Sequence, residues 1–444
     1  MATTTFVDTV TLVVSAWLQD INDAIYSGIG ISGKTTVASA TTPDIFAATI
    51  KQIIDYTGTA TCTGFVAAPA IGSRRVLVCA AAAVFTAGAT MIINGVASGS
   101  NFTAAANDKI EVIAVTTTLF HLIPQKANGF PVVTPITCHA GGRLTLTTVV
   151  PVLTASVTGA TTVYYTPYLH RYVPIYDGTN MLMSDVGAEL SQTTADSTKS
   201  PAAVAASSNY DVFVWNDSGT YRATRGPAWT SGTARGTGAG TTELQYVIGV
   251  LLNKVAITNG PAANRGTYVG TIGSNASSTI DFIFGAVAAS GTAGVLNVWN
   301  MYNRVSVSSN TGDSTDSWTY TTATWRSANN SNTMRCSFVL GLNEDTISAS
   351  YGVHSANSTS AVFRACGIGL DSTSAIATGS YAAGHAQANN AIATTIGRFE
   401  GLGGLGTHYV QALEYSAATG TTTWYGDNAN AAVYQNNIAC TLRM

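Results

Sequence analysis

Charged side chains are scarce in this chain. Of its 444 residues, 20 are Lys or Arg and 23 are Asp or Glu, so charged residues make up 10%, whereas an ordinary soluble domain has about 25%. Faces with so few charges can pack against copies of themselves without desolvating many ions, and each unpaired ion that is buried costs several kcal/mol. The composition therefore favours a structural protein that associates with itself.

Clusters of positive charge and long apolar runs are also absent. The formal net charge is -3 and the basic residues are scattered, whereas a nucleic-acid interface needs a basic stripe. No run of about 18 apolar residues occurs, so we expect no membrane insertion. The first residues lack the charged and apolar regions of a secretory signal, which predicts synthesis in a cytoplasm. Because 46% of the residues are hydrophobic, the chain should fold rather than remain disordered.

Residue spacings that hold metals are missing as well. The six cysteines lie far apart and form no C-x-x-C pair, and the six histidines form neither H-x-H nor H-E-x-x-H. These patterns do not predict a metal or cofactor site. Buried free thiols are the expectation for a reducing compartment. In an oxidising one, Cys336 and Cys366 are the first pair to test for a disulfide.

Carboxylates in the C-terminal half do not form a recognisable catalytic pair. Cleavage of a glycoside needs two carboxyl groups about 5 to 9 Å apart. Most acidic residues here stand in stretches rich in Ser, Asn or Gly, which is typical of solvated turns. Glu344 and Asp345 are neighbours, and neighbours on a strand point to opposite faces. We therefore predict no catalytic residues and no enzyme.

Helical periodicity is confined to the beginning of the chain. Residues 15–26 have apolar side chains on one helical face and Ser15 as a possible N-cap. Residues 43–56 form a second candidate, because Pro43 precedes apolar residues at helical spacing. After Tyr56 the apolar pattern has a period of two, with β-branched and aromatic residues between Gly, Asn and Pro. Dipeptides such as Asp177-Gly178 predict tight turns in hairpins.

These patterns predict a mainly β protein with a short helical head, followed by several antiparallel β-modules of sandwich or barrel type. Shifts in composition suggest the boundaries. We expect a head over residues 1–56, β-modules over 57–130 and 131–274, and a C-terminal β-sandwich-like domain over 275–444.

Aromatic residues of the C-terminal third are the best candidates for recognition, because rings beside polar groups are common at binding hot spots. In strands, however, aromatic residues belong to the core more often than to a site. The run Trp424 to Asp427 reads as a turn, which predicts exposure of Trp424. The candidate binding residues are Trp318, Tyr320, Trp325, Trp424, Tyr425 and Asp427.

The opening segment TFVDTVTLVVSAWLQDINDAIY resembles the N-terminal segment of many bacteriophage tail-fibre and tailspike proteins. Thr9 and Gln19 depart from the usual glycine and asparagine. The matching residues are Phe6, Val7, Asp8, Trp17, Leu18, Asp20, Asn22, Asp23, Ala24 and Tyr26. The resemblance implies that this segment attaches the protein to a phage particle. The residues expected to anchor it are Phe6, Trp17, Leu18, Ile21 and Tyr26.

A central segment beginning GGRLTLTTVVPV is similar to a module of phage virion proteins, in which an R-L-T-L strand precedes A-T-T-L-Y-Y-T-P-Y and Y-D-G. The resemblance covers about residues 141–307. The matching residues are Arg143, Leu144, Thr145, Leu146, Pro151, Val152, Tyr164, Tyr165, Thr166, Pro167, Tyr168, Tyr176, Asp177 and Gly178.

The two resemblances together imply a homotrimeric tail fibre, made in the host cytoplasm and assembled into the virion. Its N-terminus would contact other virion proteins of the tail, the baseplate or the portal region, and its C-terminal domain would bind a host surface glycan or protein. A capsid or collar decoration protein, such as a head fibre, is the first alternative. A tailspike-type polysaccharide depolymerase is the second.

Overall fold

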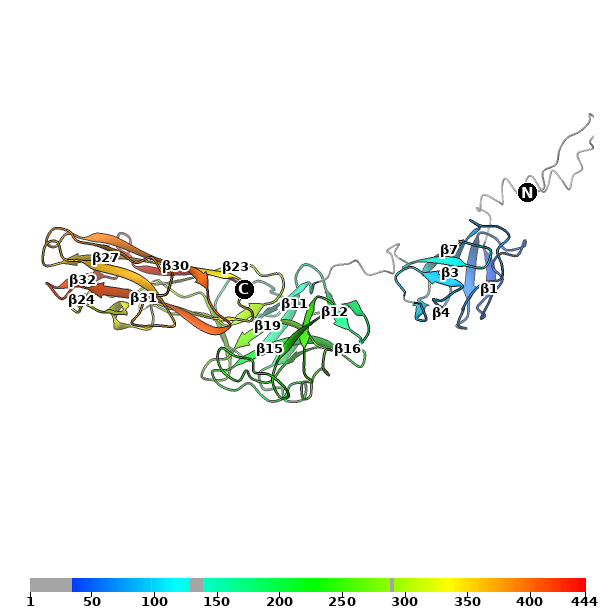
Figure 1. Cartoon of the computed structure of the whole chain (residues 1–444), viewed down its shortest axis with the longest axis horizontal. Coiled ribbons are helices and arrows are strands. Elements are labelled where there is room, and N and C mark those ends of the chain that lie inside the picture. Colours follow the sequence, from blue (N-terminus) through cyan, green and yellow to red (C-terminus); the bar gives the residue numbers. More distant parts are fainter. Residues whose placement is uncertain (1–33, 97, 128–138, 288–290) are drawn as a thin grey trace, which may run out of the picture. The chain divides into compact units, whose positions relative to one another are not determined.

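The computed structural model describes residues 34–96, 98–127, 139–287 and 291–444. The chain divides into two compact units, residues 1–135 and 136–444, which are described separately below. In the described residues of both units, strands are the main regular secondary structure (Figure 1), so the prediction of a mainly β protein is confirmed. The predicted helix over residues 15–26, and with it the anchoring residues, lies outside the described residues. None of the described helical segments is long and apolar enough to cross a bilayer.

The first unit contains a six-stranded sheet and a small hairpin. The sheet has the order β1-β2-β3-β7-β8-β5, with parallel pairs at β1-β2, β2-β3 and β5-β8. The hairpin pairs β4 with β6. The strands are β1 (Thr35–Ala38), β2 (Ile53–Thr57), β3 (Arg74–Cys79), β4 (Ala83–Thr86), β5 (Met91–Ile93), β6 (Asn101–Ala104), β7 (Lys109–Ala114) and β8 (Phe120–Gln125).

The predicted helix over residues 43–56 is wrong. Asp44 accepts hydrogen bonds from the N–H groups of Phe46 (3.0 Å) and Ala47 (2.9 Å), which closes a turn instead of starting a helix. Residues 53–57 form β2, where Ile54 and Tyr56 are buried in alternation. The β-branched residues Ile53 and Ile54 are compatible with both the helical and the strand pattern of apolar residues. Pairing of this segment with β3 makes it a strand. Because β2 crosses residue 56, the expected boundary between head and first module falls inside a sheet.

The second unit begins with three sheets. One has the order β14-β11-β9, another pairs β12 with β13, and a third has the order β16-β15-β19-β18-β17 with β22 beside β19. Gly178 has φ +105° in the β12–β13 turn, as the Asp-Gly pattern predicts. The strands are β9 (Gly142–Thr145), β11 (Thr162–Pro167), β12 (Tyr172–Tyr176), β13 (Met181–Asp185), β14 (Leu190–Thr193), β15 (Asn209–Asp217), β16 (Thr220–Arg225), β17 (Leu244–Val247), β18 (Val250–Asn253), β19 (Thr267–Gly273) and β22 (Val298–Asn300).

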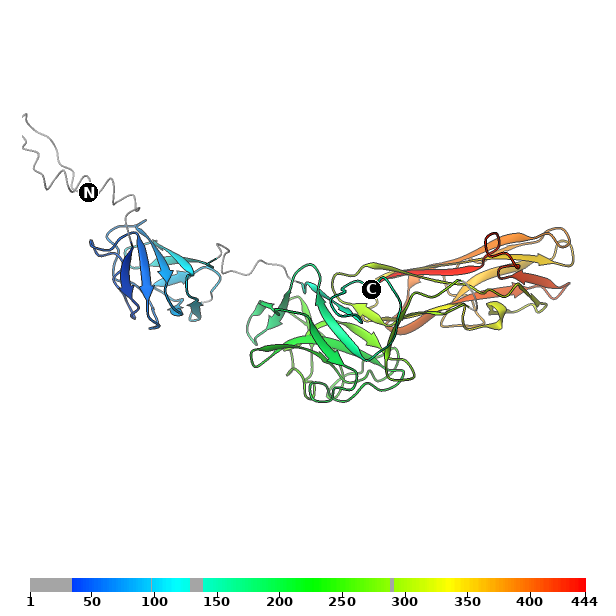
Figure 2. The same ribbon diagram turned by 180° about the vertical axis from the view of Figure 1, so that it is seen from behind.

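Two further sheets complete the second unit as a C-terminal β-sandwich, whose long strands run side by side in both views (Figure 1, Figure 2). The eight-stranded sheet has the order β10-β20-β21-β26-β31-β28-β29, with β25 beside β31. Its strands are β10 (Val157–Ala160), β20 (Ile280–Ile283), β21 (Gly294–Leu296), β25 (Trp325–Ser327), β26 (Arg335–Leu340), β28 (Arg364–Leu370), β29 (Ala383–His385) and β31 (Gly406–Ser416).

The second sheet of the sandwich, here called the β27 sheet, has the order β23-β33-β27-β32-β24, with β30 beside β27. A short 3-10 turn, η2 (Ala328–Asn330), follows β25. The strands of the β27 sheet are β23 (Ser306–Thr311), β24 (Ser317–Tyr320), β27 (Thr346–Asn357), β30 (Ala393–Leu402), β32 (Thr422–Tyr425) and β33 (Asn437–Arg443).

The expected boundary at residue 274 does not separate two modules. Strand β10 pairs with β20, and β19 pairs with β22, so sheets join segments from both sides of that position. One continuous hydrophobic core contains Phe213 and Tyr268 together with Phe338 and Tyr351. Composition carries no information about pairing between segments distant in sequence, so a shift in composition cannot locate this boundary.

Three buried arginines connect segments of the second unit through hydrogen bonds to main-chain carbonyl groups. Arg364 donates to the hydroxyl (2.9 Å) and carbonyl (3.0 Å) of Ser355 and to the carbonyl of Ala391 (3.0 Å). Arg225 similarly donates to the carbonyls of Thr193 (3.1 Å), at the end of β14, and of Asp196 (2.8 Å), in the loop that follows. Arg143 bonds the carbonyls of Pro151, Asn303 and Met444. The R-L-T-L motif therefore has a structural explanation, since its arginine holds together three distant segments.

Candidate binding groove

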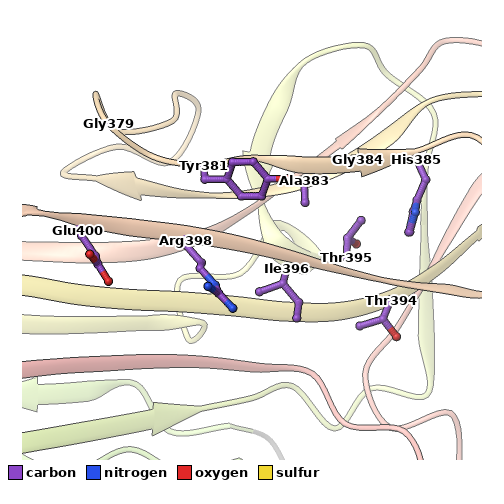
Figure 3. Close-up of a pocket in the computed structure, with 10 residues that line it drawn as sticks. All are labelled: Gly379, Tyr381, Ala383, Gly384, His385, Thr394, Thr395, Ile396, Arg398 and Glu400. Carbon is purple, nitrogen blue, oxygen red and sulfur yellow. The ribbon is translucent and has the colours of Figure 1, made fainter.

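An open groove of about 540 Å³ lies at one edge of the C-terminal sandwich. The segment leading into β29 forms one side and β30 the other (Figure 3). Both are at the margins of their sheets, because β29 pairs with β28 and β30 pairs with β27. The lining residues are Gly379, Tyr381, Ala383, Gly384, His385, Thr394, Thr395, Ile396, Arg398 and Glu400.

Alternation along β30 decides which of its side chains are available. Thr395, Gly397 and Phe399 face the core, while the residues between them are exposed, as expected for a strand with one buried face. The exposed set is Thr394, Ile396, Arg398 and Glu400, and Figure 3 shows these four side chains in a row along the strand.

A close approach of glycines holds β30 against the eight-stranded sheet. A Cβ atom added at Gly397 would lie 2.7 Å from the Cα atom of Gly367 in β28. Only a residue without a side chain fits there, because real Cβ atoms do not come that close to backbone. Gly397 therefore allows β30 to lie close to β28.

Tyr381 is tied directly to β30. Its N–H donates to the carbonyl of Arg398 (2.7 Å), and the N–H of Arg398 donates to the carbonyl of Tyr381 (2.8 Å). The Ser380 hydroxyl also donates to the Arg398 carbonyl (2.9 Å). Residues that exchange both hydrogen bonds across an antiparallel pair carry their side chains on the same face. The ring of Tyr381 and the guanidinium of Arg398 thus project from the same face of the paired backbone, one from each side of the groove.

The groove displays polar groups that have no partner within the described part of the chain. Arg398 and Glu400 make neither an ion pair nor a side-chain hydrogen bond there. The Nε2 atom of His385 is buried and likewise without a partner. The hydroxyl of Thr394 is oriented by the Nδ1 atom of His354 at 2.9 Å, and burial lowers the pKa of that histidine. The exposed side chains of Thr394, Arg398 and Glu400 can exchange hydrogen bonds with a ligand.

The aromatic candidates from the sequence lie elsewhere. Trp424, expected to be exposed, is 0% exposed, and Trp318 is 9% exposed. They pair across β24 and β32 in the interior, and the Trp318 indole N–H donates to Glu414 at 2.7 Å. The exposure prediction for Trp424 is wrong, because Trp424 and Tyr425 close strand β32 and the turn begins only at Gly426.

The remaining candidates are half-buried and do not form one site with the tryptophans. Tyr320 is covered by the guanidinium of Arg326, 3.8 Å from its ring centroid. Trp325 lies on the eight-stranded sheet with its ring 5.5 Å from that of Tyr415. Tyr425 packs near Tyr434, and Asp427 accepts a hydrogen bond from the N–H of Ala429 (3.1 Å), which stabilises a turn.

The acidic neighbours Glu344 and Asp345 have a structural role, because both form ion pairs with Arg304, at 3.0 and 2.7 Å. Among the described residues, no group of three His, Cys, Asp or Glu side chains is arranged to hold a metal ion. The sequence reasoning missed Tyr381 and Arg398. The signal available was the alternation in ATTIGRFEGL, which marks every second residue of one strand as exposed.

The five described cysteines are buried free thiols. The neighbour of Cys336 is Cys440 rather than Cys366. The thiol of Cys336 and burial together raise the pKa of Cys440, and the Cys366 thiol donates instead to the carbonyl of Tyr351 (3.6 Å). Burial also raises the pKa of Cys62, Cys79 and Cys366, and the low thiolate content of a cysteine with a raised pKa makes it unreactive.

Comparison with protein-family models finds no match for this sequence, and no curated protein matches it significantly.

Proposed function

We propose that the protein is a non-enzymatic structural protein of a bacteriophage virion, of the tail-fibre type. Its N-terminal segment attaches it to the particle, and its second unit contacts the host surface. It acts as a homotrimer, in keeping with the phage-like segments and the low charge of the chain. The observation that carries the proposal is the open groove beside β30, with exposed Tyr381, Arg398 and Glu400.

The chemistry of the groove supports binding rather than catalysis. Glu400 is the one carboxylate among its lining residues, whereas hydrolysis of a glycoside uses two. Glu414, the other carboxylate of interest in this sandwich, is fully enclosed and bonded to Trp318 and Arg326, so a substrate has no path to it. Several weak sites on one fibre give high avidity, by factors of about 10² to 10⁴, and an open groove suits that mode.

The test uses labelled full-length protein and the bacterial host of the phage. We expect saturable binding to cells, inhibition of phage adsorption by the free protein, and a trimer by size-exclusion light scattering. Phage that encode the protein without residues 1–33 should still produce a folded protein, since the deletion leaves every described strand intact. The shortened protein should not be incorporated into virions.

Other outcomes would identify the alternatives. A folded protein that is incorporated into virions, yet binds no cells and leaves adsorption unchanged, would indicate a decoration protein of the capsid or collar. Release of oligosaccharides from host polysaccharide, abolished by substitution of Glu400, would indicate a depolymerase. Incorporation of the shortened chain would remove the anchoring role of its first 33 residues.

A further inference from the structure

We infer that the groove between β29 and β30 binds an uncharged saccharide chain through its vicinal hydroxyl groups. This inference rests on the proposed function and makes it more specific, because it chooses a glycan over a protein as the receptor. It is argued from the side chains in Figure 3.

The ring of Tyr381 is presented to solvent at a fixed position. Tyr381 is 65% exposed, although its backbone is held by the two hydrogen bonds to Arg398. An exposed ring beside hydrogen-bonding groups is available to a ligand, because a tyrosine combines an apolar face with a polar hydroxyl. A tyrosine offers a large contact area at low cost in conformational entropy, and a preorganised backbone lowers that cost further. The C–H groups of a sugar ring can pack on such a face.

Arg398 and Glu400 supply complementary hydrogen-bonding groups beside that ring. A guanidinium has five donors and a carboxylate has only acceptors. Two adjacent sugar hydroxyls can accept from the first and donate to the second. Since the two residues are two positions apart on one strand face, both can reach the same stretch of ligand.

The balance of charge selects an uncharged ligand. An acidic sugar would be attracted by Arg398 but repelled by Glu400. An amino sugar would be attracted by Glu400 but repelled by Arg398. A protein epitope would also need larger apolar contact, and the exposed apolar side chain of β30 inside the groove is Ile396, at 43% exposure. That single contact fits the apolar face of a sugar ring.

The length of the groove favours a chain over a single sugar. Its β30 side runs from Thr394 to Glu400, which corresponds to about 20 Å for an extended strand. Thr394, oriented by His354, and the unpartnered Nε2 atom of His385 lie toward one end, with Arg398 and Glu400 toward the other. Polar groups at both ends can fix the register of several linked sugars.

The test compares Tyr381→Ala with Tyr246→Ala in the full-length protein, because Tyr246 is equally exposed, at 65%, on β17 of the same unit. Binding to host cells is measured before and after treatment of the cells with periodate, which cleaves vicinal diols, or with protease. We expect Tyr381→Ala to weaken binding about tenfold or more, a loss of about 1.4 kcal/mol, and Tyr246→Ala to leave it unchanged. Periodate should abolish binding and protease should not.

An array of maltooligosaccharides and mannooligosaccharides, oligogalacturonides and chitosan oligomers tests the choice of charge. The parent protein should bind only uncharged members, with little dependence on salt. Glu400→Gln leaves Arg398 unopposed, so this variant should gain binding to oligogalacturonides that falls with added salt. Arg398→Gln should not gain it.

The outcomes separate the two proposals. If cells bind the protein after periodate treatment, or equally well with Tyr381→Ala, the protein remains a host-binding fibre and the saccharide site is wrong. If neither cells nor any array member bind the parent protein, both proposals fail. Binding to uncharged array members that depends on Tyr381, without binding to host cells, would support the saccharide site and contradict the receptor-binding function.

Discussion

The two units of the chain bury different kinds of side chain. Among the described residues 34–127, Asp108 is the one buried polar side chain, and the core consists of residues such as Phe85 and Leu77. The second unit buries many hydroxyl, amide and charged groups as well, including Arg225 and Arg364. Each such group needs hydrogen-bond partners when it leaves water.

The difference shows where a chain with few charged residues buries them. In the first unit, the paired strands pack on a core that is apolar apart from Asp108. In the second, a buried arginine reaches carbonyl groups of loops that the strands do not pair, and so fixes loops that carry little apolar surface. Burial lowers the pKa of Arg143 to about 10, so Arg143 stays charged at neutral pH, with main-chain oxygens as its acceptors.

Among the substitutions that test this difference between the units, loss of a buried arginine should reduce stability most. Arg364→Met should destabilise the second unit by about 4 kcal/mol, because two carbonyls and a hydroxyl would lose their donor. Tryptophan fluorescence during denaturation reports on this unit, since six of the seven tryptophans lie in it. The exposed Arg398→Met is the matched control and should change stability little. Equal effects of the two would show that the buried bonds contribute nothing special.

A cavity in the first unit should have the next largest effect. Leu77→Ala removes a fully buried side chain of β3 and should cost about 3 kcal/mol. Hydrogen exchange in peptides from residues 34–127 should accelerate, whereas the tryptophan-detected transition should not move. A shift of both would contradict the division into two independently packed units.

The buried Glu414 should make the second unit lose stability as the pH rises. Burial raises its pKa to about 7, although Arg326 and Trp318 bond to it. The folded state therefore binds more protons than the unfolded state between about pH 4.5 and 7, and stability falls with pH in that window.

Relative to Glu414→Gln, the parent protein should lose on the order of 2 kcal/mol across that window. His408 acts in the same direction, because Asp371 raises its pKa, but it is present in both proteins and cancels in the difference. Denaturation of both proteins at several pH values measures it. A difference that grows with pH would instead show that Arg326 dominates and lowers the pKa of Glu414.

The smallest effect is expected at Asp108, the polar exception in the first unit. Its carboxylate accepts from the N–H groups of Ala105 (2.9 Å) and Ala127 (3.1 Å) and pairs with the half-exposed Lys126 at 3.4 Å. Asp108→Asn keeps one acceptor and should cost about 1 kcal/mol. Hydrogen exchange at Ala105 and Ala127 would reveal the lost bond. An unchanged rate at both would mean that solvent already satisfies these amides.

Periodicity in the sequence predicted strands well, but it did not predict which strands pair with each other. The alternation around residues 393–402 corresponds directly to the two faces of β30. Residues 53–57, by contrast, match a helical pattern and become a strand because β1 and β3 pair on either side. The aromatic candidates fail for the same reason, since Trp424 and Trp318 are enclosed by a sheet whose strands come from residues 306–443.

The amino-acid sequence by itself determined the β class, the low charge, the turn at Gly178 and the alternation that exposes Arg398 and Glu400. These properties depend on neighbouring residues along one strand or turn. The tertiary structure alone decided that β29 and β30, eight residues apart in the chain but in different sheets, become the two sides of a groove. That decision required the approach of Gly397 to Gly367, a contact between strands that no local pattern encodes.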